Sequence, residues 1–176
     1  ECKEQLPQCA AVVDPHRPDR TYPHTMLSGV GIAFKLAAAL SGDQDAVARR
    51  YCDLICLGTI ADVMTLQGEN RRLVVMGLEA LRQPQRLGLR ALIHACGCDE
   101  QEITAGSIGY ILAPRVNAAG RMGAADLAAD LLQETDPAKA EELAKQLCDL
   151  NRERQAVEQS ICADAIAQIE RLRPEE

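Results

Sequence analysis

Three segments of the sequence carry charged or polar side chains in patterns that suit chemistry better than packing. The first is the end of an apolar helical pattern, where Gly58 and Thr59 are followed by Asp62. An aspartate held at a helix boundary projects its carboxylate freely, and such oxygen atoms are the ligands that Mn²⁺ and Mg²⁺ prefer. The same pattern also suits a solvated aspartate that caps the next turn. Asp62 is therefore a candidate metal ligand with a structural alternative.

The second segment, Leu112 to Arg121, has two arginines six residues apart around an asparagine and several small residues. The guanidinium groups of Arg115 and Arg121 present paired donors that match phosphate oxygens. The alanines and glycine between them allow another molecule to approach the backbone closely. A phosphate-binding segment is one interpretation, and two surface arginines on a glycine-rich turn is the other.

The third segment, Asp149 to Gln155, lies inside a long helical pattern, and Arg154 stands where that pattern would place an apolar residue. Arg154 suits either an ion pair with an acid of the main domain or a contact with phosphate. We expect the ion pair, because it is the more common use of such an arginine.

The elements that must position these segments are mostly helical. Apolar residues recur at three- and four-residue steps, and serine, threonine, aspartate, glycine and proline stand at the expected ends. A short buried strand is expected at Gln8–Val13. Pro114 is expected to end the helix Thr104–Leu112, which precedes it in the sequence. The expected helices are Met26–Leu40, Gln44–Ile60, Glu69–Leu81, Leu87–Ala95, Thr104–Leu112, Asp126–Gln133 and Pro137–Arg173.

The last helix differs from the others in length. Asp136 is suited to cap it, Pro137 suits its first position, and no proline or glycine interrupts it before Pro174. At about 1.5 Å per residue, the helix would extend roughly 55 Å, which exceeds the width of a small domain. We therefore expect it to leave the globule as a connector or a coiled-coil partner.

The composition supports a helical domain and restricts its partners. The chain has 176 residues, 47% of them hydrophobic, with no tryptophan, one phenylalanine and three tyrosines. A β-sandwich usually contains more aromatic and β-branched residues, so packed helices are favoured. The net charge of −7 repels phosphate at long range. Any contact with nucleic acid must therefore be confined to a local basic cleft.

The eight cysteines predict free thiols in a reducing compartment. No apolar stretch is long enough to cross a bilayer and no signal-like segment opens the chain, so we expect the cytoplasm and no membrane contact. Cys52 and Cys56 lie one helical turn apart, as buried thiols do. His94, Cys96 and Cys98 could suggest zinc, but no second cysteine pair follows them.

Taken in order, these segments resemble the RecJ-type single-stranded DNA exonucleases of the DHH phosphoesterase superfamily. Leu57–Asp62 resembles the fourth DHH motif, and Gly68–Arg71 resembles the turn that follows it. Leu112–Arg121 resembles a later signature, and Leu150–Gln155 resembles the start of the connector helix. The segment from Tyr22 to Leu36 matches as well, so the resemblance covers nearly the whole chain.

The resemblance implies a metal-dependent enzyme that digests single-stranded DNA from its 5′ end to its 3′ end in repair and recombination. It implies two Mn²⁺ or Mg²⁺ ions, with Asp62 as a metal ligand and therefore a catalytic residue. It also implies that Arg115, Asn117 and Arg121 contact the DNA strand near the cleaved phosphate. Single-stranded DNA and repair or recombination proteins are the implied partners.

The implied fold is mainly α, as the C-terminal part of an α/β DHH domain with a long connector helix. Residues 1–135 would form the DHH part and residues 136–176 the connector. The family's Asp-x-Asp and Asp-His-His motifs and its later Gly-Gly-His motif are not found. We therefore expect a piece of a longer protein that is inactive alone. The alternatives are a DHH phosphoesterase acting on oligoribonucleotides or cyclic dinucleotides, and a non-catalytic interaction module.

Overall fold

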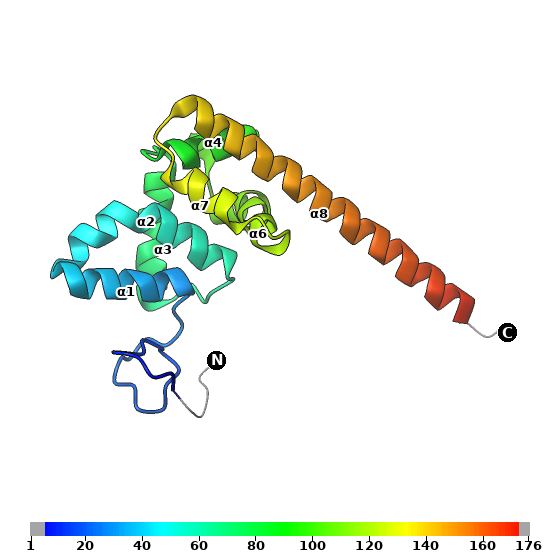
Figure 1. Cartoon of the computed structure of the whole chain (residues 1–176). Helices are drawn as coiled ribbons and strands as arrows, with labels where there is room; N and C mark the ends of the chain where they lie inside the picture. The colour runs from blue at the N-terminus through cyan, green and yellow to red at the C-terminus, as the bar shows by residue number, and fades with distance from the viewer. Residues whose placement is uncertain (1–5, 173–176) are drawn as a thin grey trace. The chain divides into compact units, whose positions relative to one another are not determined.

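The computed structural model describes residues 6–172, which form helices and loops without a β-strand (Figure 1). The expectation of a mainly helical fold is confirmed. The described residues pack as two compact units. The first contains residues up to Gln85 together with Gly97–Ala113, and the second contains Arg86–Cys96 and the residues from Pro114 onward.

The first unit is built around α2 (Gln44–Ala61), against which α1 (Gly29–Ser41) and α3 (Gly68–Leu81) both pack. Ser28 and Asp43 cap α1 and α2, because their side chains accept hydrogen bonds from backbone N–H groups of the first turn. The three predicted helices are thus confirmed to within a few residues. Their shared core is made by Phe34, Ala38, Val47, Ala48, Ile55 and Leu73.

The first unit also contains a short irregular stretch after Gly97. It comprises a 3-10 turn (η1, Glu100–Glu102), one α-helical turn (α5, Ala105–Ser107) and a π-helical turn (η2, Ile108–Leu112). Thr104 forms a capping box with Ser107, in which each side chain accepts from the other residue's backbone N–H. Thr104, the first residue of the predicted helix Thr104–Leu112, is therefore its cap.

The prediction that Pro114 ends the helix is wrong, because α6 (Ala113–Arg121) begins immediately before it. In the preceding π-helical turn the N–H of Ala113 donates to the carbonyl of Ile108. Pro114 therefore falls in the first turn of a new α-helical segment. There its fixed φ suits the helical backbone.

The second unit packs α4 (Leu87–Ala95), α7 (Ala125–Gln133) and the first half of α8 (Pro137–Leu172) against one another. Gly88 of α4 lies against the backbone of α7: a Cβ added there would come within 1.8 Å of the Leu131 carbonyl oxygen. Three leucines, Leu89, Leu92 and Leu147, are fully buried between these helices. The predicted helices of this unit are confirmed.

The long helix is confirmed, and the loop that precedes it is tightly bonded. The carboxylate of Asp136 accepts the N–H of Lys139 at 3.0 Å, as a helix cap does. Glu134 accepts the N–H groups of Asp136 and Thr135 and pairs with the Lys139 ammonium at 2.9 Å. These contacts lower the pKa of Glu134 to about 2, and the hydrogen bond from the Asp136 N–H has the largest effect.

The second half of α8 is solvated. Beyond the buried Asn151, the residues up to Arg171 are exposed, apart from the half-buried Arg154 and Ala167. Figure 1 shows α8 continuing past α4 and α7 in the same unit. The expectation that this helix leaves its globule is therefore confirmed for the second unit.

Two other expectations have different outcomes. The strand predicted at Gln8–Val13 is wrong: the segment is irregular, and Cys9, Ala10 and Ala11 are exposed. A strand needs a neighbour to satisfy its backbone, and the described residues offer none. The predicted division into a DHH part (1–135) and a connector (136–176) describes functional parts and not packing units, so it stays a prediction.

The thiols behave as predicted at Cys52 and Cys56, which are free and buried. Burial, with the neighbouring Cys52 and Asp53, raises the pKa of Cys56 to about 12, so its thiol stays protonated. Within residues 6–172 no group of three or more histidine, cysteine or acidic side chains is arranged to hold a metal. The helices described contain none that is long and apolar enough to cross a membrane.

Candidate functional site

Asp62 is the C-terminal cap of α2, and its side chain is exposed. The helix is anchored by Ile55 and Leu57, which are at most 4% exposed, so the position of Asp62 is set by a buried face one to two turns earlier. Its carboxylate lies at the C-terminal end of α2, where the helix dipole is negative. No side chain in the described part of the chain pairs with this carboxylate. The location favours a cation.

The turn after Asp62 holds Val63 in a backbone conformation that usually belongs to glycine. The N–H of Met64 donates to the carbonyl of Thr59 and that of Val63 to the carbonyl of Ile60, which is the Schellman arrangement. Val63 has φ of 53°, and among the described residues it is the only non-glycine with positive φ. Val63 is 90% exposed, so no packing contact offsets that strain. Strain of this kind is characteristic of functional sites.

The Gly68–Arg71 turn is held by a buried amide. Asn70 is 1% exposed, and its Nδ2 donates to the carbonyl of Met26 and, at 3.1 Å, to that of Thr65. Ser28 and Thr59, also buried, lie 3.2 Å apart between their hydroxyl oxygens. These contacts tie the chain on both sides of Asp62 to the start of α1, so much of this motif serves to position the turn.

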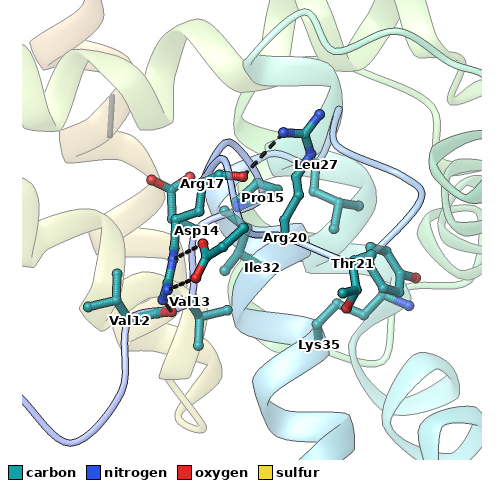
Figure 2. A pocket seen from close by; sticks show the side chains of 12 residues that line it. Val12, Val13, Asp14, Pro15, Arg17, Arg20, Thr21, Leu27, Ile32 and Lys35 are labelled. Atoms are coloured by element: carbon teal, nitrogen blue, oxygen red, sulfur yellow. Dashed lines mark hydrogen bonds and ion pairs between the residues drawn. The ribbon is translucent and has the colours of Figure 1, made fainter. Parts of the chain in front are cut away.

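A pocket of about 450 Å³ lies in the first unit between the irregular N-terminal segment and α1 (Figure 2). Two of its cationic side chains, those of Arg17 and Lys35, form ion pairs. Arg17 forms two hydrogen bonds with Asp19, which lower the pKa of that carboxyl. Lys35 is ion-paired with Glu69, and its Nζ lies 5.0 Å from the centre of the Tyr22 ring.

Lys35 keeps its charge in this pocket. Burial disfavours the ammonium form, but the interactions with Glu69 and Tyr22 outweigh it and raise the pKa of Lys35. Tyr22 also donates its hydroxyl to Glu69 at 2.8 Å. Paired groups of this kind stabilise the segment before α1.

Arg115 lies in the second unit, where it lines a pocket of about 390 Å³. The pocket is formed by α4, α6 and α8, and its lining residues are Ala95, Cys96, Arg115, Lys145, Cys148 and Arg152. We call it the basic pocket, because three of the six side chains are cationic. Lys145 was not among the residues predicted from the sequence. The available signal was its spacing of three and then four residues to Cys148 and Arg152, which places all three on one face of a helix.

Asn117 and Arg121 do not join Arg115. The segment is a helix rather than a glycine-rich turn, and at about 100° per residue Asn117 is rotated roughly 200° from Arg115. Asn117 and Arg121 are four residues apart and share a face, on which Arg121 is exposed. The structure thus divides the three expected DNA contacts between two faces of α6. Asp62 belongs to the first unit.

The expected ion pair of Arg154 with the main domain is wrong. Its guanidinium donates to Glu158 at 2.8 Å and to Asn151 at 3.4 Å, and both partners lie on α8 itself. The spacing of four residues between Arg154 and Glu158 brings them together on one helix face without any tertiary contact.

The chain matches known proteins along nearly its entire length. No protein-family model matches it. Solved structures with the same fold are metal-bound exonucleases: a manganese-bound exonuclease is 35% identical, with a TM-score of 0.79 over 96% of this chain and 43% of that one. A magnesium complex from Thermus thermophilus is 37% identical, with a TM-score of 0.71 over 84% of this chain and 23% of that one.

These structures are RecJ proteins, and the curated relatives carry the same name. The single-stranded-DNA-specific exonuclease RecJ of Bacillus subtilis is 45% identical over 94% of this chain, and that of Escherichia coli is 34% identical over 96%. The chain is therefore a RecJ-type sequence, homologous to one segment of these proteins. It spans 21% of the length of the Bacillus relative and 32% of that from Escherichia coli.

Proposed function

We propose that this chain is part of a metal-dependent exonuclease that digests single-stranded DNA from the 5′ end in the cytoplasm, in repair and recombination with partner proteins of those processes. The observation that carries the proposal is the match in sequence and fold to RecJ over nearly the whole chain. Asp62 and Arg115 lie within the motifs quoted for the resemblance. No feature of the described residues favours the cyclic-dinucleotide or interaction-module alternatives.

Asp62 suits one ligand position of a divalent metal ion. Its carboxylate is a hard oxygen donor without a side-chain partner in residues 6–172, at the negative end of a helix. The described residues supply no complete ligand set, so the other ligands would come from parts of a RecJ protein that the chain does not match. Mn²⁺ or Mg²⁺, when bound, would supply an activated water and stabilise charge at phosphorus.

The arginines of α6 suit the DNA strand. Arg115 is half-buried in the basic pocket, so its guanidinium is held in position before the strand arrives. Asn117 and Arg121 lie on another face of α6 and would contact a different part of the strand. Of these three residues, Arg115 would make the phosphate contact nearest the basic pocket.

Removing Arg115 should make DNA binding less sensitive to salt. The experiment uses a chimera, in which this chain replaces the matching segment of the Bacillus subtilis RecJ, with EDTA to prevent digestion. Each lost phosphate contact on a single strand lowers the slope of log affinity against log salt by about 0.7. Arg115→Ala should show that loss in a salt titration, while Arg90→Ala, an exposed arginine of the same unit, should not.

A structural arginine would behave differently. Arg115→Ala would then lower the melting temperature of the chimera and leave the salt slope of the folded protein unchanged. That pair of results would remove Arg115 from the proposed contacts.

A further inference from the structure

The loop that follows α2 is held in place by hydrogen bonds and not by packing. Of its six residues, 62–67, only Met64 is half-buried, and the others are exposed. An exposed loop with few apolar contacts opens easily unless its backbone is bonded to a fixed element. The bonds that anchor this loop therefore determine where it lies.

Strain at Val63 opposes the closed form of the loop. Val63 has a φ of 53°, which a β-branched residue adopts only at a cost in free energy. That conformation lets the N–H groups of Val63 and Met64 donate to carbonyls in the last turn of α2. If Val63 relaxed, both hydrogen bonds would break, and the turn that carries Asp62 would fray.

Asn70 anchors the loop against this strain. It lies in the first turn of α3 and is 1% exposed, and its Nδ2 donates to the carbonyl of Thr65 at 3.1 Å and to that of Met26. One bond thus holds the middle of the loop, and the other joins α3 to the segment before α1. The buried hydroxyls of Ser28 and Thr59 join that segment to α2. The two helices that bear the loop are therefore tied to the same segment.

A buried amide at this position indicates a role beyond filling space. Burying a polar group costs free energy that an apolar side chain of similar volume does not cost. The amide nitrogen of Asn70 offsets this cost through two carbonyl groups, and both lie outside α3. Leucine would fill the same space without a polar group to satisfy. The amide is therefore suited to holding the loop.

We propose that Asn70 is a positioning residue for the metal site, which holds the loop against the strain at Val63 and so keeps the carboxylate of Asp62 oriented for a divalent cation. In this role Asn70 acts through Asp62 and needs no contact with the metal. The role of Asp62 as a metal ligand rests on the proposed function, whereas the anchoring of the loop does not. Loss of a group that orients a metal ligand typically weakens metal binding by about 10- to 100-fold.

The anchoring is tested on this chain alone, by amide hydrogen exchange. In Asn70→Ala the amides of Val63 and Met64 should exchange about tenfold faster than in the wild-type chain, because the loop opens more often. Asn151→Ala is the matched control, since Asn151 is also a buried asparagine but lies in the second unit. It should leave the exchange of both amides unchanged. Equal exchange in Asn70→Ala and the wild-type chain overturns the proposal.

The effect on the metal is measured in the Bacillus subtilis chimera. Free Mn²⁺ is followed by its electron paramagnetic resonance signal, so that binding is measured without reference to activity. Asn70→Ala should raise the dissociation constant of Mn²⁺ about tenfold, and Asn151→Ala should leave it unchanged. Asn70→Ser, which keeps one donor, takes the place of the alanine variant if circular dichroism shows that the latter is unfolded. An unchanged dissociation constant in the folded Asn70 variant overturns the proposal.

Two double variants test the path from Asn70 to the metal. Val63→Gly should restore Mn²⁺ affinity to the Asn70 variant, because glycine adopts a positive φ without strain and the exposed valine has no packing to lose. In an Asp62→Asn background, Asn70→Ala should have no further effect on affinity. Failure of the rescue, or a further tenfold loss in the Asp62→Asn background, contradicts the proposed path.

The results also separate this proposal from the proposed function. A chimera that loses Mn²⁺ affinity in Asn70→Ala but digests no DNA without the substitution contradicts the proposed function alone. An active chimera whose Mn²⁺ affinity is the same with and without Asn70→Ala contradicts the role of Asn70 alone.

Discussion

Replacing Asp62 by asparagine in the chimera should abolish release of nucleotides from single-stranded DNA and leave the melting temperature unchanged. The carboxylate is exposed and without a side-chain partner among the described residues, so the fold loses little when its charge is removed. A metal ligand is different, because even groups that only orient ligands cost about 10- to 100-fold when they are removed. We therefore expect a loss of at least about 100-fold.

The control for this prediction lies on the same helix. Asp45 is an exposed aspartate of α2 that pairs with Arg72 on the surface, and such pairs contribute little to stability. Asp45→Asn should retain activity. The two variants are compared by their initial rates across a Mn²⁺ titration. An Asp62→Asn chimera with the wild-type rate and melting temperature would show that Asp62 is a helix cap and not a metal ligand.

Gly77→Ala should destabilise the first unit strongly. A Cβ at this position would lie 2.2 Å from the Cβ of Cys56 and 2.3 Å from the carbonyl oxygen of Cys52. Alanine gains about 1 kcal/mol of helix propensity over glycine, but overpacking of this severity costs about 3 kcal/mol. The second effect is larger, because the obstructing atoms belong to the core of α2 and its backbone. The free energy of unfolding should fall by about 2 kcal/mol.

The matched control is Gly29→Ala, since a Cβ at Gly29 meets no atom within 4 Å. That variant should be slightly more stable, by less than about 1 kcal/mol. Urea denaturation of the two variants beside the wild-type chain gives both numbers. Equal stability of Gly77→Ala and Gly29→Ala would show that α2 and α3 do not approach as closely as the structure has them.

The sequence predicted the helices because local physics determines them. Thr104 and Asp136 each cap the helix that they were expected to start, and apolar periodicity predicted the buried faces. The long helix followed from the absence of any proline or glycine after Pro137. The location of Asp62 at a helix end was predictable for the same reason.

The errors arose where the outcome depends on other elements or on rare backbone geometry. Pro114 does not end a helix, because a π-helical turn before it places it in a first turn, and no local pattern predicts such a turn. The strand at Gln8–Val13 was predicted from apolar content without a pairing partner. Arg154 forms its ion pair with Glu158, which lies on the same helix.

The candidate site was predictable only in part. Asp62 and Arg115 were found from residue type and motif, but the cluster of Arg115 with Lys145 and Arg152 needs α4, α6 and α8 to pack together. The separation of Arg115 from Asn117 follows from α6 being a helix. A sequence expected to form a turn there could not show which residues share a face.

The measurement that tests the central claim most directly is the activity of the unmodified chimera. A 3′-labelled single-stranded oligonucleotide and its duplex are incubated with the chimera and Mn²⁺, and then again after EDTA is added. The account predicts stepwise release of nucleotides from the single strand, sparing of the duplex and complete loss of activity with EDTA. A chimera that is folded by circular dichroism and thermal melting, yet leaves the single strand intact in Mn²⁺, would contradict it.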